Sequence, residues 1–349
     1  MKLHIADMLR SQRAKHISFH TPGHKKAGAD ITELSYSDCL VSPCGVIARA
    51  ERDIAEILGA SYSFILTDGS TAGVFSMLYA LKAAGGHAVA APVFSHPSVL
   101  HACEAMGLEI VPIPQNVDYG IPQQPDKNAM DAALKRADAL LLTSPDYYGN
   151  FPNLTAARSL CKWADKPLLI DGAHGGHLHF EENVYAGSFA DMWVDGVHKS
   201  LPAMTQGAVV SAKTEMWAER LLKGVRTFRT TSPSYPIMAS VEYAVKYPRN
   251  EAMENASRAF KCGHGCLENG DWTKIVVPFG DKCDDAQAFL EAHGVYPEFN
   301  DKNYLMFYLS PCTKAKELKL LGKFLDRLSR GEVKKDAPTG SIPMYSEET

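Results

Sequence analysis

The sequence has 349 residues, of which 46% are hydrophobic and 22% are charged, and its formal net charge is −4. This balance is ordinary for a globular protein of about two domains and gives no basic surface for nucleic acid. No apolar run approaches the roughly 18 residues of a membrane span, and the N-terminus lacks the apolar core of a signal peptide, so we expect a cytoplasmic protein without a membrane or nucleic-acid partner.

The eight cysteines are expected to be free thiols, because disulfides are rare in cytoplasmic proteins. Cys262 and Cys266 flank His264 at a spacing that could suggest a zinc site. The sequence offers no second ligand pair to match them, so we expect no metal.

Short apolar runs alternate with helical patterns through most of the chain. Strands are expected at residues 64–66, 88–93, 108–113, 139–142 and 208–211 and within 167–174 and 190–200; helices are expected at 3–15, 46–58, 72–84, 126–136, 154–163, 215–222 and 237–246, with one more ending at 106 and a turn at 69–71. This alternation predicts a mostly parallel sheet covered by helices on both faces.

A smaller unit is expected from about residue 250. Its predicted strands are 274–277 and 304–309, and its predicted helices are 284–293 and 314–330. We therefore expect an N-terminal arm at 1–45, a large α/β domain at 46–249, a small α/β domain at 250–330 and a flexible tail at 331–349.

An acid and an amine follow two of the predicted strands. In open α/β sheets, ligands bind outside the carboxyl ends of the strands, where Asp171 and Lys199 are expected to lie. A pyridoxal phosphate (PLP) enzyme needs this pair: a lysine for the Schiff base and an acid facing the pyridinium nitrogen. Taken alone, such a lysine is more often a solvated surface residue, and such an acid is often a helix cap.

Other polar residues fall at the same edge of the predicted sheet. Ser70 and Thr71 stand at the start of a helix, where unpaired amides favour a phosphate, although an ordinary N-cap would look the same. His96 could stack on a flat cofactor ring or simply cap a helix. The convergence of several such positions, rather than any one of them, favours a cofactor site.

Seven motifs carry a resemblance to a known family. They are Phe19–Lys25, Asp68–Gly73, Ser95–Ser98, Ser144–Gly149, Asp171–His177, His198–Lys199 and Thr230–Tyr235. In this order, over roughly residues 3–310, they resemble the Orn/Lys/Arg decarboxylases, PLP enzymes with the aspartate-aminotransferase-like fold type I. The resemblance implies an α/β protein with a mostly parallel central sheet flanked by helices and a small α+β C-terminal domain.

The resemblance also implies the roles of single residues. Lys199 would form the Schiff base and later donate a proton, Asp171 would pair with the pyridinium nitrogen, and His174 would lie near the Schiff base. The remaining cofactor-binding residues would be His96 and Ala173 on the two faces of the ring, Gly69, Ser70, Thr71 and His198 at the phosphate, and Ser232, in a loop that reaches a neighbouring subunit. The working unit would be a homodimer with shared active sites.

Several positions depart from the family's pattern. Gly196 stands where the family often has a serine, Gly172 where it often has an acid, and Asp146 where threonine is commoner. The chain is also short, so we expect it to lack the N-terminal wing domain, and hence the ring-shaped decamers, and most of the C-terminal domain.

The expected reaction is decarboxylation of a basic amino acid: lysine, ornithine or arginine. Another PLP reaction, such as an aminotransferase or lyase, remains open, as does a PLP-binding protein without turnover. Residues 259–326 contain no arginine to hold a substrate carboxylate throughout a transamination, which favours decarboxylation. Candidate acids for the substrate's distal cation are Asp146, Glu298 and Asp301, each otherwise expected to be a solvated surface acid.

Overall fold

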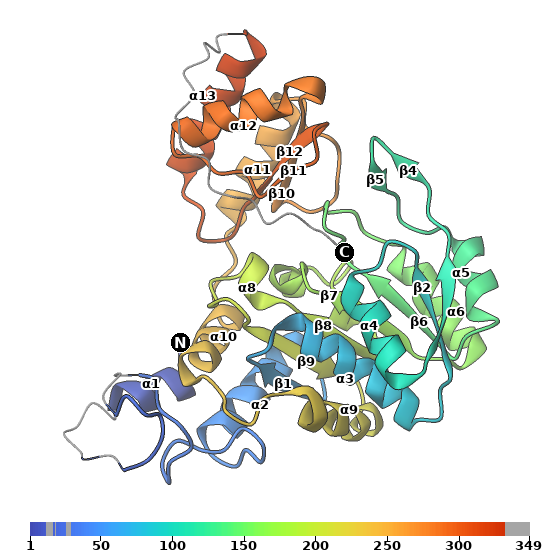
Figure 1. Cartoon of the computed structure of the whole chain (residues 1–349), viewed down its shortest axis with the longest axis vertical. Coiled ribbons are helices and arrows are strands. Elements are labelled where there is room, and N and C mark those ends of the chain that lie inside the picture. Colours follow the sequence, from blue (N-terminus) through green and yellow to red (C-terminus); the bar gives the residue numbers. More distant parts are fainter. Residues whose placement is uncertain (12–16, 18, 26–28, 332–349) are drawn as a thin grey trace. The chain divides into compact units, whose positions relative to one another are not determined.

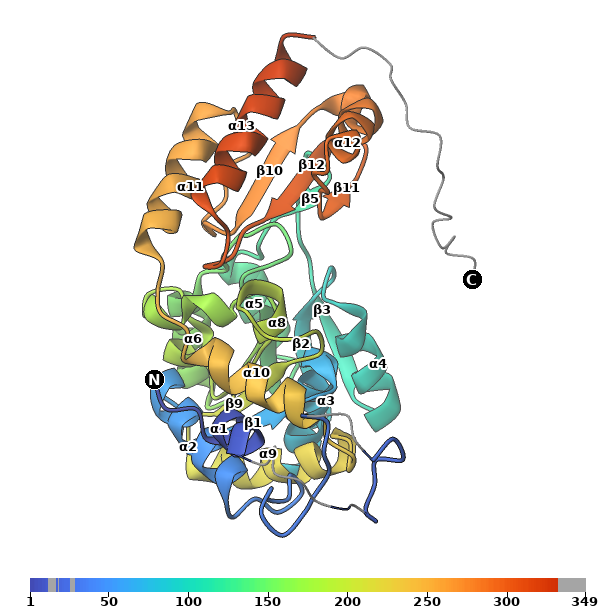
Figure 2. The ribbon, with the colours of Figure 1, turned by 90° about the vertical axis from the view of Figure 1, so that its left-hand side faces the viewer.

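The computed structural model describes residues 1–11, 17, 19–25 and 29–331 (Figures 1 and 2). The chain divides into two compact units: the first holds residues 1–250 together with 310–312, and the second holds 251–309 and the described residues from 313 onward. Among the described helices, none combines the length and the apolar character that crossing a membrane requires.

A seven-stranded sheet forms the centre of the first unit, in the order β1-β9-β8-β7-β6-β2-β3. Its strands are β1 (Tyr62–Leu66), β2 (Ala88–Pro92), β3 (Glu109–Ile113), β6 (Ala139–Thr143), β7 (Leu168–Gly172), β8 (Met192–Asp195) and β9 (Ala208–Ala212). Only β9 runs antiparallel to its neighbours β8 and β1, so the predicted mostly parallel sheet is confirmed. A separate small hairpin joins β4 (Val117–Asp118) to β5 (Ile121–Pro122).

Helices cover both faces of this sheet, because its strands are apolar on both sides. One apolar core includes α1 (His4–Ser11), α2 (Val46–Leu58), α5 (Lys127–Leu134), α6 (Leu154–Ala164) and α10 (Tyr235–Val245), and the other includes α3 (Gly69–Ala83), α4 (Pro97–Met106) and α9 (Glu215–Phe228). Along β7, Ile170 belongs to the first core and Leu169 to the second. Since side chains alternate along a strand, Asp171 faces the side of α3 and Gly172 the opposite side.

Helix α3 is packed tightly between the sheet and α9. A Cβ atom on Gly73 would lie 2.5 Å from the side chain of Val194 in β8. On its other side, a Cβ atom on Gly224 of α9 would lie 2.5 Å from the carbonyl oxygen of Ser76. A side chain at either glycine would collide with these atoms, so both contacts depend on its absence.

Some predicted elements differ from the structure. Residues 69–71 are not a turn but the first residues of α3, and α9 continues to Phe228 instead of ending at residue 222. Three short elements near the ends of β7 and β8 were not predicted: η1 (Gly176–Phe180), α7 (Ala186–Phe189) and α8 (Val197–Ser200). The short elements at 117–118, 121–122, 280–282 and 299–300 were not predicted either. The end of the predicted helix 3–15 and the tail beyond residue 331 lie outside the described residues.

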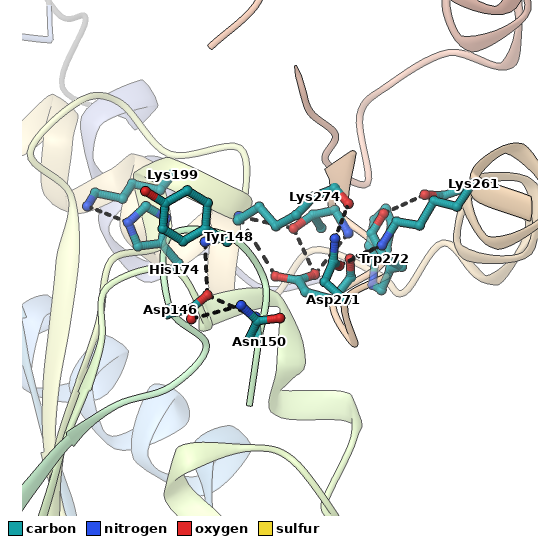
Figure 3. Close-up of polar contacts among 12 residues, drawn as sticks. Asp146, Tyr148, Asn150, His174, Lys199, Lys261, Asp271, Trp272 and Lys274 are labelled. Carbon is teal, nitrogen blue, oxygen red and sulfur yellow. Dashed lines mark hydrogen bonds and ion pairs between the residues drawn. The ribbon is translucent and has the colours of Figure 1, made fainter. Parts of the chain in front are cut away.

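The second unit is an antiparallel three-stranded sheet, in the order β10-β12-β11, that shares one apolar core with its helices. Its elements are α11 (Glu251–Gly263), β10 (Lys274–Pro278), η2 (Gly280–Lys282), α12 (Cys283–Ala292), β11 (Phe299–Asn300), β12 (Tyr304–Tyr308) and α13 (Ala315–Ser329). At the start of β10, the ammonium of Lys274 lies 3.9 Å from the centre of the Tyr308 ring and 3.8 Å from Asp271 Oδ2 (Figure 3). This is the α+β unit that the sequence predicts, with α11 as an addition.

Candidate active site

Lys199 and His174 are brought together at the carboxyl ends of β8 and β7. Lys199 lies in α8, a single turn that begins directly after Gly196, and His174 follows β7 by two residues. The Lys199 Nζ atom lies 3.2 Å from His174 Nε2, within hydrogen-bond distance (Figure 3). The half-buried amine therefore has beside it an imidazole nitrogen that can accept or donate a hydrogen bond.

Asp171, the penultimate residue of β7, is a buried carboxyl group with an exposed fraction of 2%. Burial raises its pKa, because the charged form loses water, while the amide of Ala173 (3.1 Å) and the charges of Lys199 and His96 oppose this rise. Asp171 therefore lies within electrostatic reach of both residues. A positively charged partner would stabilise its ionised form.

His96 caps the N-terminus of α4, where its Nδ1 accepts a hydrogen bond from the amide of Ser98 at 3.1 Å. Burial lowers the pKa of His96, and the charges of Asp171 and Lys199 act on it with opposite signs. The structure thus brings His96, Asp171 and Lys199 together, although His96 is also the capping residue that the sequence allowed as an alternative.

The N-terminus of α3 and the α8 turn are joined through one stretch of backbone. The amide of Gly69, at a φ of 75°, donates to the carbonyl of Gln206 at 2.9 Å, and His198 Nδ1 lies 3.0 Å from the carbonyl oxygen of Gly207. Burial lowers the pKa of His198. Ser70 and His198, far apart in the sequence, are therefore held on adjacent parts of the same edge.

Ser70 differs from its neighbour Thr71. The Ser70 hydroxyl is buried and has no hydrogen-bond partner among the described residues, whereas Thr71 is exposed.

Ser232 is exposed as well, and its amide donates to Thr230 Oγ1 at 3.1 Å. The amide of Thr230 in turn donates to Asp68 Oδ2 at 3.2 Å, so the loop of Ser232 starts beside the N-terminus of α3 in its own chain.

These residues fit PLP. The start of a 15-residue helix, together with the unpartnered Ser70 hydroxyl, offers donors to a phosphate. The buried Asp171 carboxylate would be stabilised by a protonated ring nitrogen. Ala173, buried beside Asp171, is small enough to leave room for a flat ring.

The two glycine departures have a steric reason. A Cβ atom on Gly172 would lie 2.7 Å from the carbonyl oxygen of Val194, and one on Gly196 would collide with the carbonyl oxygen of Ala173 and lie 2.8 Å from Ser70 Oγ. Larger residues at either position would push β7 and β8 apart. A side chain at position 196 would therefore crowd the Ser70 hydroxyl.

Asp146 is not the solvated surface acid that the sequence predicts. Its carboxylate accepts hydrogen bonds from the amides of Tyr148 and Asn150, both at 2.9 Å (Figure 3). It also accepts one from the side chain of Gln124 at 2.9 Å. Burial raises its pKa, and these donors oppose the rise. Asp146 therefore holds together its own loop.

That loop carries a site residue that sequence reasoning missed. The ring of Tyr147 meets the ring of His174 edge to face, with centroids 5.4 Å apart, and so packs against the partner of Lys199. In the sequence, Tyr147 stands out only as part of the motif Ser144–Gly149. Tyr147 could have been identified from one signal: an acid followed directly by an aromatic residue, in the loop after a buried strand.

Cys262 and Cys266 are both free thiols. Cys262 is exposed, and His264 Nδ1 lies 2.9 Å from the carbonyl oxygen of Phe260. Among the described residues, the one cluster with suitable ligand spacing is His4, Asp53 and Glu242. There the ammonium of Lys246 already lies 2.6 Å from Asp53 and 2.9 Å from Glu242, so the carboxylates have their counter-charge.

Known proteins resemble this chain in sequence. The family "Orn/Lys/Arg decarboxylase, major domain" matches residues 7–262. The chain is 31% identical over 271 residues to the uncharacterized protein YaaO of Bacillus subtilis, covering 70% of this chain and 56% of that protein. It is 30% identical over 262 residues to an arginine decarboxylase of Halalkalibacterium halodurans, covering 67% and 53%. The chain thus spans about half the length of these curated relatives.

Solved structures are similar to this chain in fold. The lysine decarboxylase LdcF of Francisella novicida superposes with a TM-score of 0.82 at 18% identity, covering 94% of this chain and 60% of that one. The enzyme SPT, solved with PLP, superposes with a TM-score of 0.65 at 14% identity, covering 81% and 76%. At such identities these matches show the fold, which is the PLP fold type I that the motifs predicted. The family match over residues 7–262 shows that the chain belongs to the Orn/Lys/Arg decarboxylase family.

Proposed function

We propose that this chain carries the PLP site of an amino-acid decarboxylase that acts on lysine, ornithine or arginine. The observation that carries the proposal is the convergence of Lys199, His174 and Asp171 at the carboxyl ends of two neighbouring parallel strands. Family membership supports the cofactor and the reaction class. The individual roles below extend what the motif resemblance implies.

Each residue type suits a part of the cofactor. Lys199 would hold it covalently through Nζ, Asp171 would face the ring nitrogen, and His96 and Ala173 would lie on opposite faces of the ring. The phosphate would be held by Gly69, Ser70, Thr71 and His198, with Ser232 contributed by a neighbouring subunit of a homodimer. When bound, PLP supplies the sink for the electron pair that remains on the substrate's α-carbon after CO2 leaves.

The chain's own residues manage the protons. An ionised Asp171 would keep a proton on the ring nitrogen, because burial penalises the charge of the carboxylate and a cationic partner reduces that penalty. His174 Nε2 can hold or return the proton of the Lys199 amine at 3.2 Å. Lys199 can then deliver a proton to the α-carbon. Tyr147, packed on His174, limits how far the imidazole can turn.

Of the three candidate acids for the substrate's distal cation, Asp146 and Asp301 already accept hydrogen bonds from nearby groups of the chain. Asp146 is occupied by four donors of its own loop and of Gln124. Asp301 accepts from the amides of Asn303 and Tyr304 at 2.9 and 3.1 Å, as a turn-capping residue does. Glu298 is exposed.

The test combines cofactor attachment with product analysis. The protein is incubated with PLP and reduced with borohydride, and the modified peptide is identified by mass spectrometry, with Lys199→Ala as the control. We expect the label on Lys199 and none in the variant. Labelled CO2 is then measured from lysine, ornithine and arginine separately. Release from one of them supports the proposal, whereas keto-acid formation without CO2, or PLP attachment with no turnover of any amino acid, would reject decarboxylation.

A further inference from the structure

Asp195 is a buried carboxyl group to which the proposed chemistry gives no role. It is the last residue of β8, four positions before Lys199, and its exposed fraction is 1%. Its Oδ2 atom accepts hydrogen bonds from the Tyr185 hydroxyl at 2.8 Å and from the Trp193 indole at 3.1 Å. Two buried side chains therefore fix the direction of this carboxylate.

The other oxygen of Asp195 faces the backbone of β7. Gly172 is its register partner in the sheet, and a Cβ atom on Gly172 would lie 3.2 Å from Asp195 Oδ1. This oxygen is buried and has no hydrogen-bond partner among the described residues, and burial raises the pKa of Asp195 to about 7. The carboxyl group thus occupies the space beside the chain between Asp171 and Ala173.

Gly196, the residue after Asp195, contacts the turn that follows β7. A Cβ atom on Gly196 would collide with the carbonyl oxygen of Ala173. The carbonyl of Gly172 accepts hydrogen bonds from the amides of Gly175 at 2.8 Å and of Gly196 at 3.5 Å. The end of β8 therefore lies directly against the turn that carries Asp171 and His174.

We propose that Asp195 is a positioning residue: anchored by Tyr185 and Trp193, its carboxyl group sets the backbone at Gly172 and so holds Asp171 and Ala173 in place for PLP. The acid that similar enzymes often carry at position 172 is here replaced by one from the neighbouring strand. This inference rests on the proposed PLP site but not on the identity of the substrate.

The experiment measures PLP affinity of the apo-protein by absorbance titration in three variants. Asp195→Ala removes the group, and we expect affinity to fall about tenfold. Asp195→Asn keeps the shape and an oxygen for Tyr185 and Trp193, so affinity should return to within about twofold of the parent protein. The matched control is Asp191→Asn. Asp191 lies at the opposite end of β8, where it pairs with Arg158 at 2.7 Å. The PLP affinity of this variant should stay within about twofold of that of the parent protein.

Two results would overturn the inference: Asp195→Ala binding PLP as tightly as the parent, or Asp191→Asn losing as much affinity as Asp195→Ala. If Asp195→Ala does not fold, Tyr185→Phe takes its place, because it removes one anchor and keeps the ring. We then expect about threefold weaker binding, and unchanged affinity would count against the role. A parent protein that binds no PLP would instead reject the proposed function itself, and this inference with it.

Discussion

At the scale of single residues, Asp171 matters through its charge. Burial alone raises its pKa, so the carboxylate needs a cationic partner to remain ionised. Asp171→Asn keeps the shape but cannot hold a proton on the ring nitrogen. We expect PLP to remain attached to Lys199 while kcat for CO2 release falls at least about a hundredfold. Near-normal turnover in this variant would contradict the role given to Asp171.

His174 provides a second prediction at this scale. His174→Phe keeps a flat ring beside Tyr147 but removes the nitrogen that lies 3.2 Å from Lys199 Nζ. Because proton transfer is lost while packing is kept, we expect kcat to fall by about tenfold to a hundredfold at unchanged PLP content. The exposed His87, placed just before β2, serves as the control, since His87→Phe should leave kcat unchanged.

At the scale of elements, the loop 146–150 depends on one carboxylate. Asp146→Asn replaces an acceptor oxygen by an amide that cannot accept from Gln124 or from the Asn150 side chain. We expect the free energy of unfolding, measured in urea, to drop by about 1–3 kcal/mol. The exposed Asp118 is the comparison, and Asp118→Asn should change stability by less than about 0.5 kcal/mol.

Two buried acids make stability depend on pH. Burial raises the pKa of Glu51 to about 7, against the opposing charge of Arg229, and that of Asp195 to about 7, against the hydrogen bonds of Tyr185 and Trp193. A folded-state pKa above the unfolded value gives stability that is complete below the unfolded pKa and is lost as pH rises through the folded pKa. The free energy of unfolding should therefore fall between about pH 5 and 7.

The measurement is a series of urea titrations across this pH range. Glu51→Gln and Asp195→Asn should each flatten the pH dependence, and the double variant should flatten it most. Equal slopes in the parent and both variants would show that neither acid titrates in this window. The variants are compared by how steeply the free energy of unfolding changes with pH and not by its absolute value, because Glu51→Gln also leaves Arg229 without its ion pair to Glu51.

The sequence predicted the long, regular elements and the parallel sheet at whose edge the candidate site residues lie. It missed α7 and α8, since four residues are too short for a helical period. It placed Asp146 in solvent because an acid after a strand usually lies there, whereas the structure gives the carboxylate a hydrogen-bond donor, Gln124, that lies over 20 positions away. Asp195 was missed for the same reason: its anchor Tyr185 lies in an irregular stretch with no pattern.

At the scale of the whole molecule, the proposed homodimer with shared active sites can be tested by complementation. Lys199→Ala lacks the amine, and Ser232→Asp places a negative charge at the proposed phosphate contact. If Ser232 serves the neighbouring subunit, a mixed dimer contains one complete site. Random mixing of the two inactive variants should then restore about a quarter of the parent's CO2 release. No recovery, with mixed dimers demonstrated by differently tagged chains, would place Ser232 outside the neighbouring site.

The glycine contacts on the two sides of α3 have a consequence for how a phosphate is received. Gly73 lies against the side chain of Val194, and Gly224 lies against the backbone of Ser76, so α3 is closely packed on both sides. We expect this packing to restrain the first turn of α3, with the Ser70 hydroxyl, before a ligand binds. Binding there orders little of the chain, so most of the attraction between donors and anion is retained as affinity instead of being spent on conformational entropy.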